Sequence, residues 1–260
     1  ICGMNAANAI PQGDFLPGAV NCQNGAKISY DVISIDTGAR VESSALNNSG
    51  APLLPIRPLE QFASGWKTIE AALIASGAAR LAIIGGGAAG VELALAVDYT
   101  LRQHLPTDKV AVALVSSGAL LGGHAPGVVK RVDQLLKSRG ITQHSGHASA
   151  HDEGLILDSG ELIACDCIIA ATGVAPPVWL ATSGLALCER GFIAVGDGQQ
   201  SISHKNVFAA GDVSSRIDSP HAKSGVYAVR AGPVLSINLQ NVLNGQPAAP
   251  YQPQKRSLYL

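Results

Sequence analysis

The strongest constraint on the fold is a glycine-rich turn set between a short apolar run and a longer apolar segment. Residues 85–90 read GGGAAG, which fits the pattern GxGxxG, and they follow the apolar run 81–84. In such a turn the first glycine permits a tight bend, the second lets the backbone approach a pyrophosphate, and the third lets a helix pack on the strand. A helix from residue 88 to about residue 105 would then hold the phosphates at its N-terminus. The pattern predicts a dinucleotide site, against the alternative of a merely flexible glycine loop.

The segments around this turn predict a doubly wound α/β unit. A helix is expected over 62–73, where apolar residues are spaced four, three and four apart, with Gly77 as its C-terminal cap. Residues 110–115 predict a second buried strand, and the apolar positions in 128–136 predict a helix that ends at Gly140. Strand, glycine turn, helix, strand and helix in this order form the core of a nucleotide-binding unit. Further short strands are expected at 141–144, 155–157 and 162–170.

The end of the second predicted strand departs from the usual pattern. A dinucleotide-binding unit carries, about 20 residues beyond the glycine turn, a carboxylate that binds the ribose of NADH or a nearby Arg that accommodates the extra phosphate of NADPH. Here Val115 is followed by Ser116 and Ser117. The sequence therefore leaves the choice between NADH and NADPH open.

An internal repeat indicates a second unit of the same kind. Residues 24–39 read NGAKISYDVISIDTGA and residues 159–174 read SGELIACDCIIAATGV. Each copy predicts a hairpin turn, then a strand (28–35 in the first copy) and then a Thr-Gly turn. The alternative is that two short apolar strands match by chance. The first copy has no strand and glycine turn ahead of it, so the first domain is expected to lack its opening half. The identical pairs, at a constant offset, are Gly25/Gly160, Ile28/Ile163, Asp31/Asp166, Ile33/Ile168, Thr37/Thr172 and Gly38/Gly173.

Two other segments are notable in the first and last thirds of the chain. Residues 41–58 contain several prolines among small residues, which predicts a loop that crosses between domains. Residues 208–213 read FAAGDV, a short apolar strand that ends in Gly211 and Asp212. The Asp212 carboxylate either accepts hydrogen bonds from a sugar-alcohol chain of a ligand or caps an Asx turn.

The apolar segment 226–243 follows Lys223 and Ser224 and predicts a helix. Its N-terminus either presents free N–H groups to an electron-rich ring atom of a ligand or simply begins a core helix. Pro233 is expected to kink or break this helix.

Composition excludes several functional classes. Eighteen Lys and Arg face nineteen Asp and Glu with no long run of either sign, which argues against a nucleic-acid-binding protein. No apolar stretch reaches the roughly 18 to 20 residues of a membrane span, and the start lacks the pattern of a signal peptide. We therefore expect a soluble, cytoplasmic protein. Neither Ile1 nor Leu260 marks an obvious start or stop, so an excised fragment is expected.

The cysteines and histidines predict no metal centre and no disulfide scaffold. Cys165 and Cys167 are expected to face one side of a strand as buried free thiols rather than as a redox disulfide. His144, His147 and His151 are close in sequence, but their spacing fits no closed metal site and the region predicts strands. No Ser-His-Asp or paired-carboxylate arrangement stands out. The five cysteines, which lack CxxC spacing, are Cys2, Cys22, Cys165, Cys167 and Cys188.

Five motifs together resemble the pyridine nucleotide-disulfide oxidoreductase superfamily. They are DTGA at 36–39, GGGAAGVELA at 85–94, ATGVAP at 171–176, FAAGDVSS at 208–215 and KSGVYAVRAGPVLSINL at 223–239. The likeness extends over nearly the whole chain and is to members without the redox disulfide, such as type II NADH dehydrogenases. IRPL at 56–59 and YQPQ at 251–254 are similar to the flavoprotein associated with selenide, water dikinase.

This resemblance implies an α/β fold with two Rossmann-like dinucleotide-binding domains, the NAD(P) domain being inserted in an incomplete FAD domain. The expected segments are 1–55 and 178–260 for the FAD domain and 56–177 for the NAD(P) domain. The FAD domain's own GxGxxG, expected before Ile1, is absent from this sequence, so retention of FAD is left open. The residues expected to bind NAD(P)H are Gly85, Gly86, Gly87, Ala88, Ala89, Gly90, Glu92, Ser116, Thr172 and Gly173. Those expected to bind FAD are Thr37, Gly38, Gly211, Asp212, Lys223 and Ser224.

The activity implied by the resemblance is that of a FAD-dependent NAD(P)H oxidoreductase. Hydride would pass from nicotinamide to flavin, and electrons would pass on to an unidentified acceptor. Because such transfer depends on orientation more than on acid–base groups, no catalytic side chain is predicted. The alternative is a non-catalytic nucleotide-binding redox module or a partner of a selenium-metabolism enzyme, and a third reading is a fragment that is inactive alone. The resemblance leaves peripheral membrane association of the intact protein open, and oligomeric state is not predicted.

Overall fold

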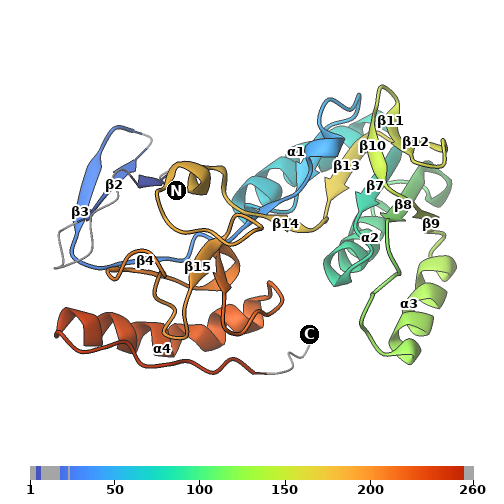
Figure 1. Ribbon diagram of the computed structural model, residues 1–260. Helices are drawn as coiled ribbons and strands as arrows, with labels where there is room; N and C mark the ends of the chain where they lie inside the picture. Colours follow the sequence, from blue (N-terminus) through green and yellow to red (C-terminus); the bar gives the residue numbers. More distant parts are fainter. Residues whose placement is uncertain (1–3, 7–17, 23, 255–260) are drawn as a thin grey trace. The chain divides into compact units, whose positions relative to one another are not determined.

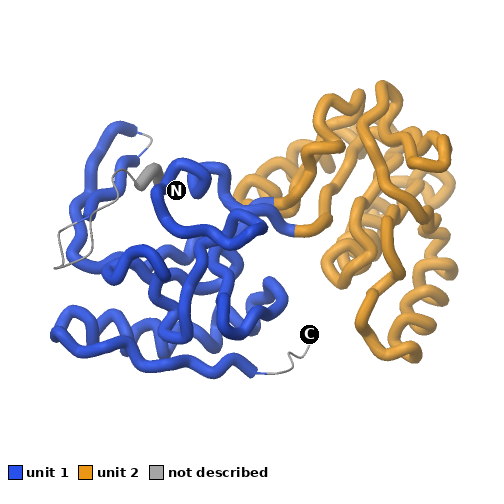
Figure 2. Tube along the Cα trace, in the orientation of Figure 1, with its two compact units in different colours: residues 1–40, 174–260 blue, residues 41–173 orange. Residues whose placement is uncertain are grey.

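The computed structural model describes residues 4–6, 18–22 and 24–254, so Cys2 lies outside the described residues. Two units form within the chain. Unit 1 comprises residues 1–40 and 174–260, and unit 2 is continuous from 41 to 173 (Figures 1 and 2). The chain passes between the units twice, through the paired strands β5 (Arg40–Val41) and β14 (Val174–Ala175).

Unit 2 is built on a five-stranded parallel sheet. β7, β8 and β9 follow one another outward in one direction, whereas β13 and β6 lie on the other side of β7. The order of the strands therefore reverses between β13 and β7, which is the topological switch point of a doubly wound sheet. The Rossmann-like α/β fold is thus confirmed, with the strand order that the sequence predicted around the glycine turn. In spatial order the strands are β6 (Leu53–Pro55), β13 (Cys167–Ala170), β7 (Ala79–Ile84), β8 (Val110–Ser116) and β9 (Thr142–Ser145).

Alternate residues of the parallel strands build two separate cores. Leu81 and Ile83 of β7 pack with the helices on one face, in a cluster that includes the fully buried Leu136. Ala82 and Ile84 pack on the other face, which an antiparallel three-stranded sheet covers. The helices are α1 (Leu59–Ser76), α2 (Ala88–Leu101) and α3 (Pro126–Ser138), and the covering strands are β10 (Ala148–His151), β11 (Gly154–Leu157) and β12 (Leu162–Ala164).

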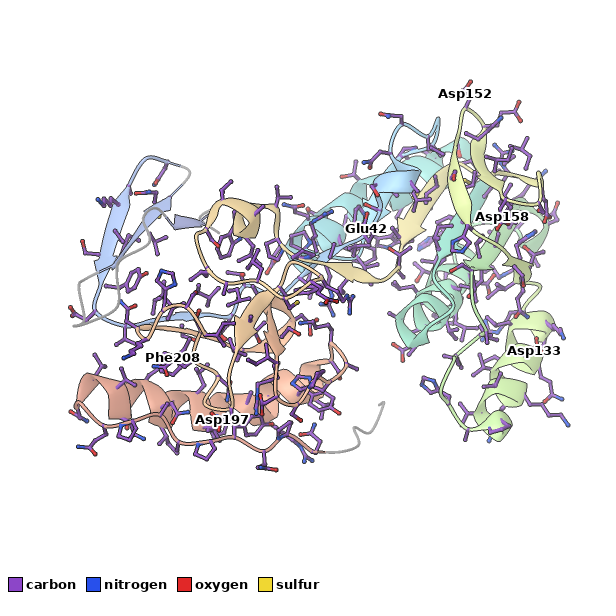
Figure 3. The ribbon with its side chains drawn as sticks, viewed as in Figure 1. Glu42, Asp133, Asp152, Asp158, Asp197 and Phe208 are labelled. Atoms are coloured by element: carbon purple, nitrogen blue, oxygen red, sulfur yellow. The ribbon has the colours of Figure 1, made fainter. Side chains whose placement is uncertain are left out.

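Unit 1 consists of short strands packed beside one long helix, α4 (Gly225–Leu243). Phe208 has no exposed surface because it packs against Ala231 and Leu235 of α4 (Figure 3). The strands form three small sheets, in which β4 runs parallel to β16 and β15 runs parallel to β17. Their bounds are β1 (Met4–Ala6), β2 (Gly18–Cys22), β3 (Lys27–Tyr30), β4 (Ile33–Ile35), β15 (Ile193–Val195), β16 (Val207–Ala209) and β17 (Ser214–Arg216). The short 3-10 helices of the chain are η1 (Ser44–Leu46), η2 (Thr107–Lys109), η3 (Val178–Thr182) and η4 (Gly211–Val213).

The two copies of the sequence repeat occupy equivalent places in the two units. In each copy the first strand, β3 or β12, ends a three-stranded antiparallel sheet, and the second, β4 or β13, runs parallel to a neighbour. The backbone hydrogen bonds correspond as well. The N–H of Ile33 donates to the carbonyl of Asn206 at 2.9 Å, and the N–H of Ile168 donates to the carbonyl of Pro52 at 2.9 Å. β16 therefore lies along β4 as β6 lies along β13.

The equivalence ends at the other edge of these strands. β13 pairs there with β7, the strand that leads into the glycine turn. Among the strands that the structure describes, none pairs with the corresponding edge of β4. Within the described residues, unit 1 therefore contains counterparts of β13 and β6 but no counterpart of β7 and its glycine turn.

Each repeat copy contains two strands, where the sequence predicted a single continuous strand. The chain bends at Asp31 in the first copy and at Asp166 in the second. Cys165 and Cys167 therefore face opposite cores, so the expectation that they share one side is wrong. Both are free thiols, and burial raises the pKa of Cys165 to about 11 and that of Cys167 to about 12.

The segment 41–58 is more ordered than the predicted crossing loop, because it contains η1 and β6. Pairing of β6 with β13 places these residues in unit 2. The two compact units are bounded after residues 40 and 173. The predicted domain bounds after residues 55 and 177 stay a prediction. The assignment of the two units to FAD and to NAD(P)H stays a prediction.

Two helices differ from their predicted forms at single residues. α2 ends at Leu101 rather than near 105, and residues 102–105 form hydrogen-bonded turns before Pro106, in which the N–H of His104 donates to the carbonyl of Leu101 at 3.0 Å. α4 runs without interruption past Pro233, so the predicted break is wrong. Pro233 is exposed, as is Val229 four residues earlier, and solvent can therefore satisfy the carbonyl that loses its helical partner.

Adjacent leucines of α3 test how strongly the helix-side core stabilises unit 2. Leu136 has no exposed surface, whereas Leu135 is 41% exposed. We expect Leu136→Ala to lower the free energy of unfolding by about 2–5 kcal/mol, because it leaves a cavity in a packed core. Leu135→Ala, the same chemical change one residue away, is expected to cost less than about 1 kcal/mol. Urea unfolding of both variants measures the difference, and equal losses would contradict the described packing.

Candidate functional site

Two glycines of the turn between β7 and α2 allow backbone contacts that a side chain would block. Gly85 has a φ of 132°, and a Cβ atom there would lie 2.2 Å from the carbonyl oxygen of Ala171, just after β13. A Cβ atom on Gly90 would lie 1.8 Å from the carbonyl oxygen of Gly85. These contacts set the first turn of α2 directly against the end of β7.

Gly87, between these two, faces open space. It is the exposed N-cap residue of α2, and a Cβ atom there would meet nothing within 4 Å. No side chain caps this helix N-terminus, and its first turn contains no acidic residue. The N–H groups and the positive end of the helix dipole therefore stand uncapped beside the open space at Gly87, which suits a phosphate-bearing ligand.

Ser116, at the end of β8, lies beside the same turn. A Cβ atom on Gly86 would lie 2.3 Å from the Ser116 Oγ. The loop that follows β8 also returns to the turn, because the N–H of Leu121 donates to the carbonyl of Gly86 at 2.7 Å. The end of β8 and the glycine turn thus form one continuous edge of unit 2.

The Thr-Gly turn of unit 2 contacts the start of that unit. The Thr172 hydroxyl donates to the carbonyl of Glu42, and the Glu42 N–H donates to the carbonyl of Gly173 at 2.8 Å. The hydroxyl that the resemblance assigns to a nucleotide is therefore engaged with the backbone next to β5. Figure 3 labels Glu42 at this place.

In unit 1 a carboxylate joins the ends of two parallel strands. Asp36, just after β4, accepts a hydrogen bond from the N–H of Ala210 at 3.1 Å and another from the Ser34 hydroxyl at 2.5 Å. Ala210 follows β16 and leads into η4, where Gly211 has a φ of 70° and Asp212 is buried. The Asp212 carboxylate therefore lies at the carboxyl end of the short β4–β16 sheet.

Lys223 is a further charged side chain of this region. Its Nζ lies 3.9 Å from the centroid of the Phe192 ring and donates to the carbonyl of Ser214. Burial lowers the pKa of Lys223 to about 8, and the positive charge of Arg190 acts in the same direction, whereas the negative charge of Asp212 acts against it. Unit 1 thus holds a partly buried amine close enough to the Asp212 carboxylate to feel its charge.

The structure brings most predicted nucleotide residues of unit 2 to one edge. Gly85, Gly86, Gly87, Ala88, Ala89, Gly90, Ser116, Thr172 and Gly173 all lie at the carboxyl ends of β7, β8 and β13. Glu92 is exposed on α2, beyond its first turn. In unit 1, Thr37 is exposed after β4, and Ser224 is the N-cap residue of α4. Whether these residues bind a ligand stays a prediction.

Sequence reasoning missed Asp36 and Glu42. Asp36 stands in the DTGA motif next to Thr37, so the motif gave a signal for it. Glu42 gave no signal, because its partner Thr172 is 130 residues away. Only the folded chain brings these two residues together.

Two of the three histidines considered for a metal take other partners. The Nδ1 of His144 lies 2.9 Å from an oxygen of Glu161, and the Nδ1 of His151 accepts the N–H of Glu153 at 3.2 Å. Within the part of the chain that the structure describes, no group of three or more His, Cys, Asp or Glu side chains is placed to hold a metal ion. Within the same ranges, no helix is both long enough and apolar enough to cross a bilayer.

Comparison with protein families and curated proteins gives consistent matches. The family described as pyridine nucleotide-disulphide oxidoreductase matches residues 7–232. Ferroptosis suppressor protein 1 of Xenopus tropicalis is 30% identical over 200 residues, covering 70% of this chain and 51% of that protein. NADH oxidase of Lactococcus lactis is 29% identical, covering 81% of this chain and 48% of that protein. The chain thus spans about half the length of these relatives.

Solved structures share the fold at low sequence identity. An engineered water-forming NADPH oxidase bound to NADPH gives a TM-score of 0.69 at 19% identity, covering 93% of this chain and 53% of that chain. An NAD-dependent persulfide reductase from A. fulgidus gives a TM-score of 0.66 at 19% identity, covering 90% of this chain and 43% of that chain. These likenesses concern the fold alone.

The different surroundings of Gly87 and Gly90 predict unequal effects of the same substitution on stability. Gly90→Ala is expected to destabilise unit 2 by about 1–3 kcal/mol or more, because its methyl group meets the carbonyl of Gly85. Gly87→Ala enters open space and is expected to change stability by less than about 0.5 kcal/mol. Thermal unfolding of the two variants measures this contrast, and equal melting temperatures would contradict the described turn.

Lys223 predicts a pH-dependent stability difference. Its pKa is about 8 in the folded protein and about 10.4 when unfolded, so the unfolded state binds more protons between these pH values. Relative to Lys223→Met, which cannot titrate, the unsubstituted protein is therefore expected to gain stability as pH rises from about 8 to about 10. Melting temperatures at both pH values measure the change. Lys205→Met, which removes an exposed lysine of unit 1, is the control, and a falling difference for Lys223 would contradict the described burial.

Proposed function

Because the chain belongs to the pyridine nucleotide-disulphide oxidoreductase family, we propose that unit 2 binds NAD(P)H and that the intact protein passes its electrons through FAD to an acceptor. NADH oxidase and ferredoxin–NAD(+) reductase components are among the relatives of this chain. The proposal covers the class of reaction and leaves the acceptor unspecified.

The observation that carries the proposal is the geometry of the glycine turn. The turn lies at the topological switch point of the sheet, where open α/β sheets bind their ligands. Gly85 and Gly90 allow its tight path, and Gly87 leaves space for a pyrophosphate to reach the helix N-terminus. A flexible glycine loop would not need close backbone contact at two glycines and open space at a third.

Within the proposal, the residues of this chain bind and orient rather than transfer protons. Backbone N–H groups at the start of α2 hold the nucleotide phosphates, and Ser116 borders the place of the adenosine ribose. Thr172 and Gly173 fix the loop after β13 to the backbone of Glu42, so one wall of the nucleotide site is held rigidly. FAD, when bound, supplies the acceptor of the nicotinamide hydride.

Unit 1 fits one half of a FAD site. Its β4 and β16 repeat the pairing of β13 and β6, and Asp212 lies beyond the carboxyl end of β16. Lys223 contacts the carbonyl of Ser214 and feels the charge of Asp212. The described residues of unit 1 contain no counterpart of the glycine turn. We therefore propose that the remaining edge of β4 takes a further parallel strand and glycine turn, and that FAD binding depends on it.

The two alternatives from the sequence have weaker support. The comparisons do not support a non-catalytic redox module or a partner of a selenium-metabolism enzyme, since the named relatives include an oxidase and several reductases. An inactive isolated chain would fit a FAD site that the described residues of unit 1 form only in part. The activities of this chain and of the intact protein should therefore be measured side by side.

Binding of NADH to the chain, followed by nucleotide fluorescence, tests the proposal at unit 2. We expect Gly87→Ala to raise the dissociation constant at least ten-fold, about 1.4 kcal/mol, because its methyl group occupies the space left for the pyrophosphate. Gly232→Ala, which also enters open space but lies on α4 of unit 1, is the matched control and is expected to bind normally.

Reduction of flavin tests the proposal for the intact protein. Bound FAD should lose its visible absorbance when NADH or NADPH is added and regain it with a quinone or dye acceptor. A bound flavin that neither nucleotide bleaches would overturn the proposed reaction.

A further inference from the structure

The hydroxyl of Ser116 is used within its own loop. Its Oγ donates to the carbonyl of Gly118 at 2.7 Å and accepts the N–H of the same residue at 3.3 Å. Both bonds close a short turn directly after β8, of the kind that Ser side chains stabilise. The side chain therefore has its hydrogen-bonding capacity largely satisfied before any ligand arrives.

This side chain nevertheless stands where a dinucleotide site discriminates between its ligands. Its Oγ lies against Gly86 of the glycine turn, and it is the last residue of the strand next to β7. A carboxylate at this place hydrogen-bonds the ribose 2′-hydroxyl of NADH and repels the 2′-phosphate of NADPH, whereas a nearby Arg attracts that phosphate. Ser116 supplies neither charge.

The neighbouring loop does not replace the missing charge. Residues 117–125 contain no Asp, Glu, Lys or Arg, and His124 is their one titratable side chain. The Nδ1 of His124 lies 3.0 Å from the carbonyl of Leu121, within the same loop. The loop therefore offers a 2′-hydroxyl or a 2′-phosphate a nearly neutral surface.

One carboxylate lies further along this edge. The N–H of Gly146, after β9, donates to the carbonyl of Ser116 at 3.0 Å. A Cβ atom on Gly146 would lie 2.5 Å from the Oδ1 of Asp158, which the turn between β11 and β12 carries. Asp158, which Figure 3 labels, is exposed, and Gly146 contacts both Asp158 and Ser116. A test of nucleotide selectivity must therefore exclude a contribution from the Asp158 carboxylate.

We infer that the nucleotide site of unit 2 accepts NADH and NADPH with similar affinity, because the end of β8 carries the self-bonded Ser116 in place of a discriminating charge. This inference rests on the proposed function, and it assigns to position 116 the selectivity of that site. The expected ratio of the two dissociation constants is below about five.

Titration of the protein with NADH and with NADPH at one fixed salt concentration tests the inference. Ser116→Asp is expected to weaken NADPH binding at least ten-fold relative to NADH, because a carboxylate then faces the 2′-phosphate. Ser117→Arg, at the exposed next position, is expected to shift the ratio in the opposite direction. Ser116→Ala is expected to leave the ratio unchanged, since the hydroxyl serves the turn.

Two controls separate local from general effects. Ser138→Asp adds the same charge at the C-terminal end of α3, which lies at the opposite edge of the sheet because crossover helices run antiparallel to the strands. It is expected to leave the ratio unchanged. Asp158→Asn is also expected to leave it unchanged, and a change there would mean that Asp158 has taken the role of the missing acid.

The outcomes distinguish this inference from the proposed function. Binding of both nucleotides by the unsubstituted protein with a preference above about five-fold would overturn the inference and leave the proposed function intact. Binding of neither nucleotide would overturn both. A melting temperature for each variant shows that the fold is retained.

Discussion

The close approach of the start of α2 to the end of β7 is the constraint on which unit 2 depends. A Cβ atom on Gly90 would lie 1.8 Å from the carbonyl of Gly85, so only a glycine lets the helix begin at this distance. Because the helix begins there, its apolar residues, such as Val91 and Ala94, reach the core formed with Leu81 and Ile83. The same contact leaves the helix N-terminus at the switch point of the sheet, where the proposed ligand site lies.

The two repeat copies have the same local sequence pattern but lie in different structural surroundings. Ile33 and Ile168 stand at the same place in their copies and donate equivalent backbone hydrogen bonds. In unit 2 the other edge of the repeat strand pairs with β7, which brings the glycine turn, whereas in unit 1 no described strand pairs with that edge. The two units therefore differ less in the repeat itself than in what completes the sheet beside it.

The shared residues of the repeat do not all keep one role. Asp166 binds Arg80, whose guanidinium lies 2.6 Å away and lowers the pKa of that carboxyl, while Asp31 is exposed. Thr172 donates to the backbone of Glu42 beside the crossing strands, whereas Thr37 is exposed after β4. Identity in sequence therefore predicted equivalent backbone positions better than it predicted side-chain partners, because partners come from segments outside the repeat.

The sequence by itself determined the elements whose signals are local. Apolar spacing over 62–73 with Gly77 gave α1, and residues 81–90 gave the strand and turn, since backbone preference and periodicity act within a few residues. Only the tertiary structure decided what depends on distant segments: that Cys165 and Cys167 enter different cores, that Leu53–Pro55 joins the sheet of unit 2, and that Thr172 meets Glu42. These contacts join residues far apart in the chain, and no local pattern records which distant strand or carbonyl a residue will meet.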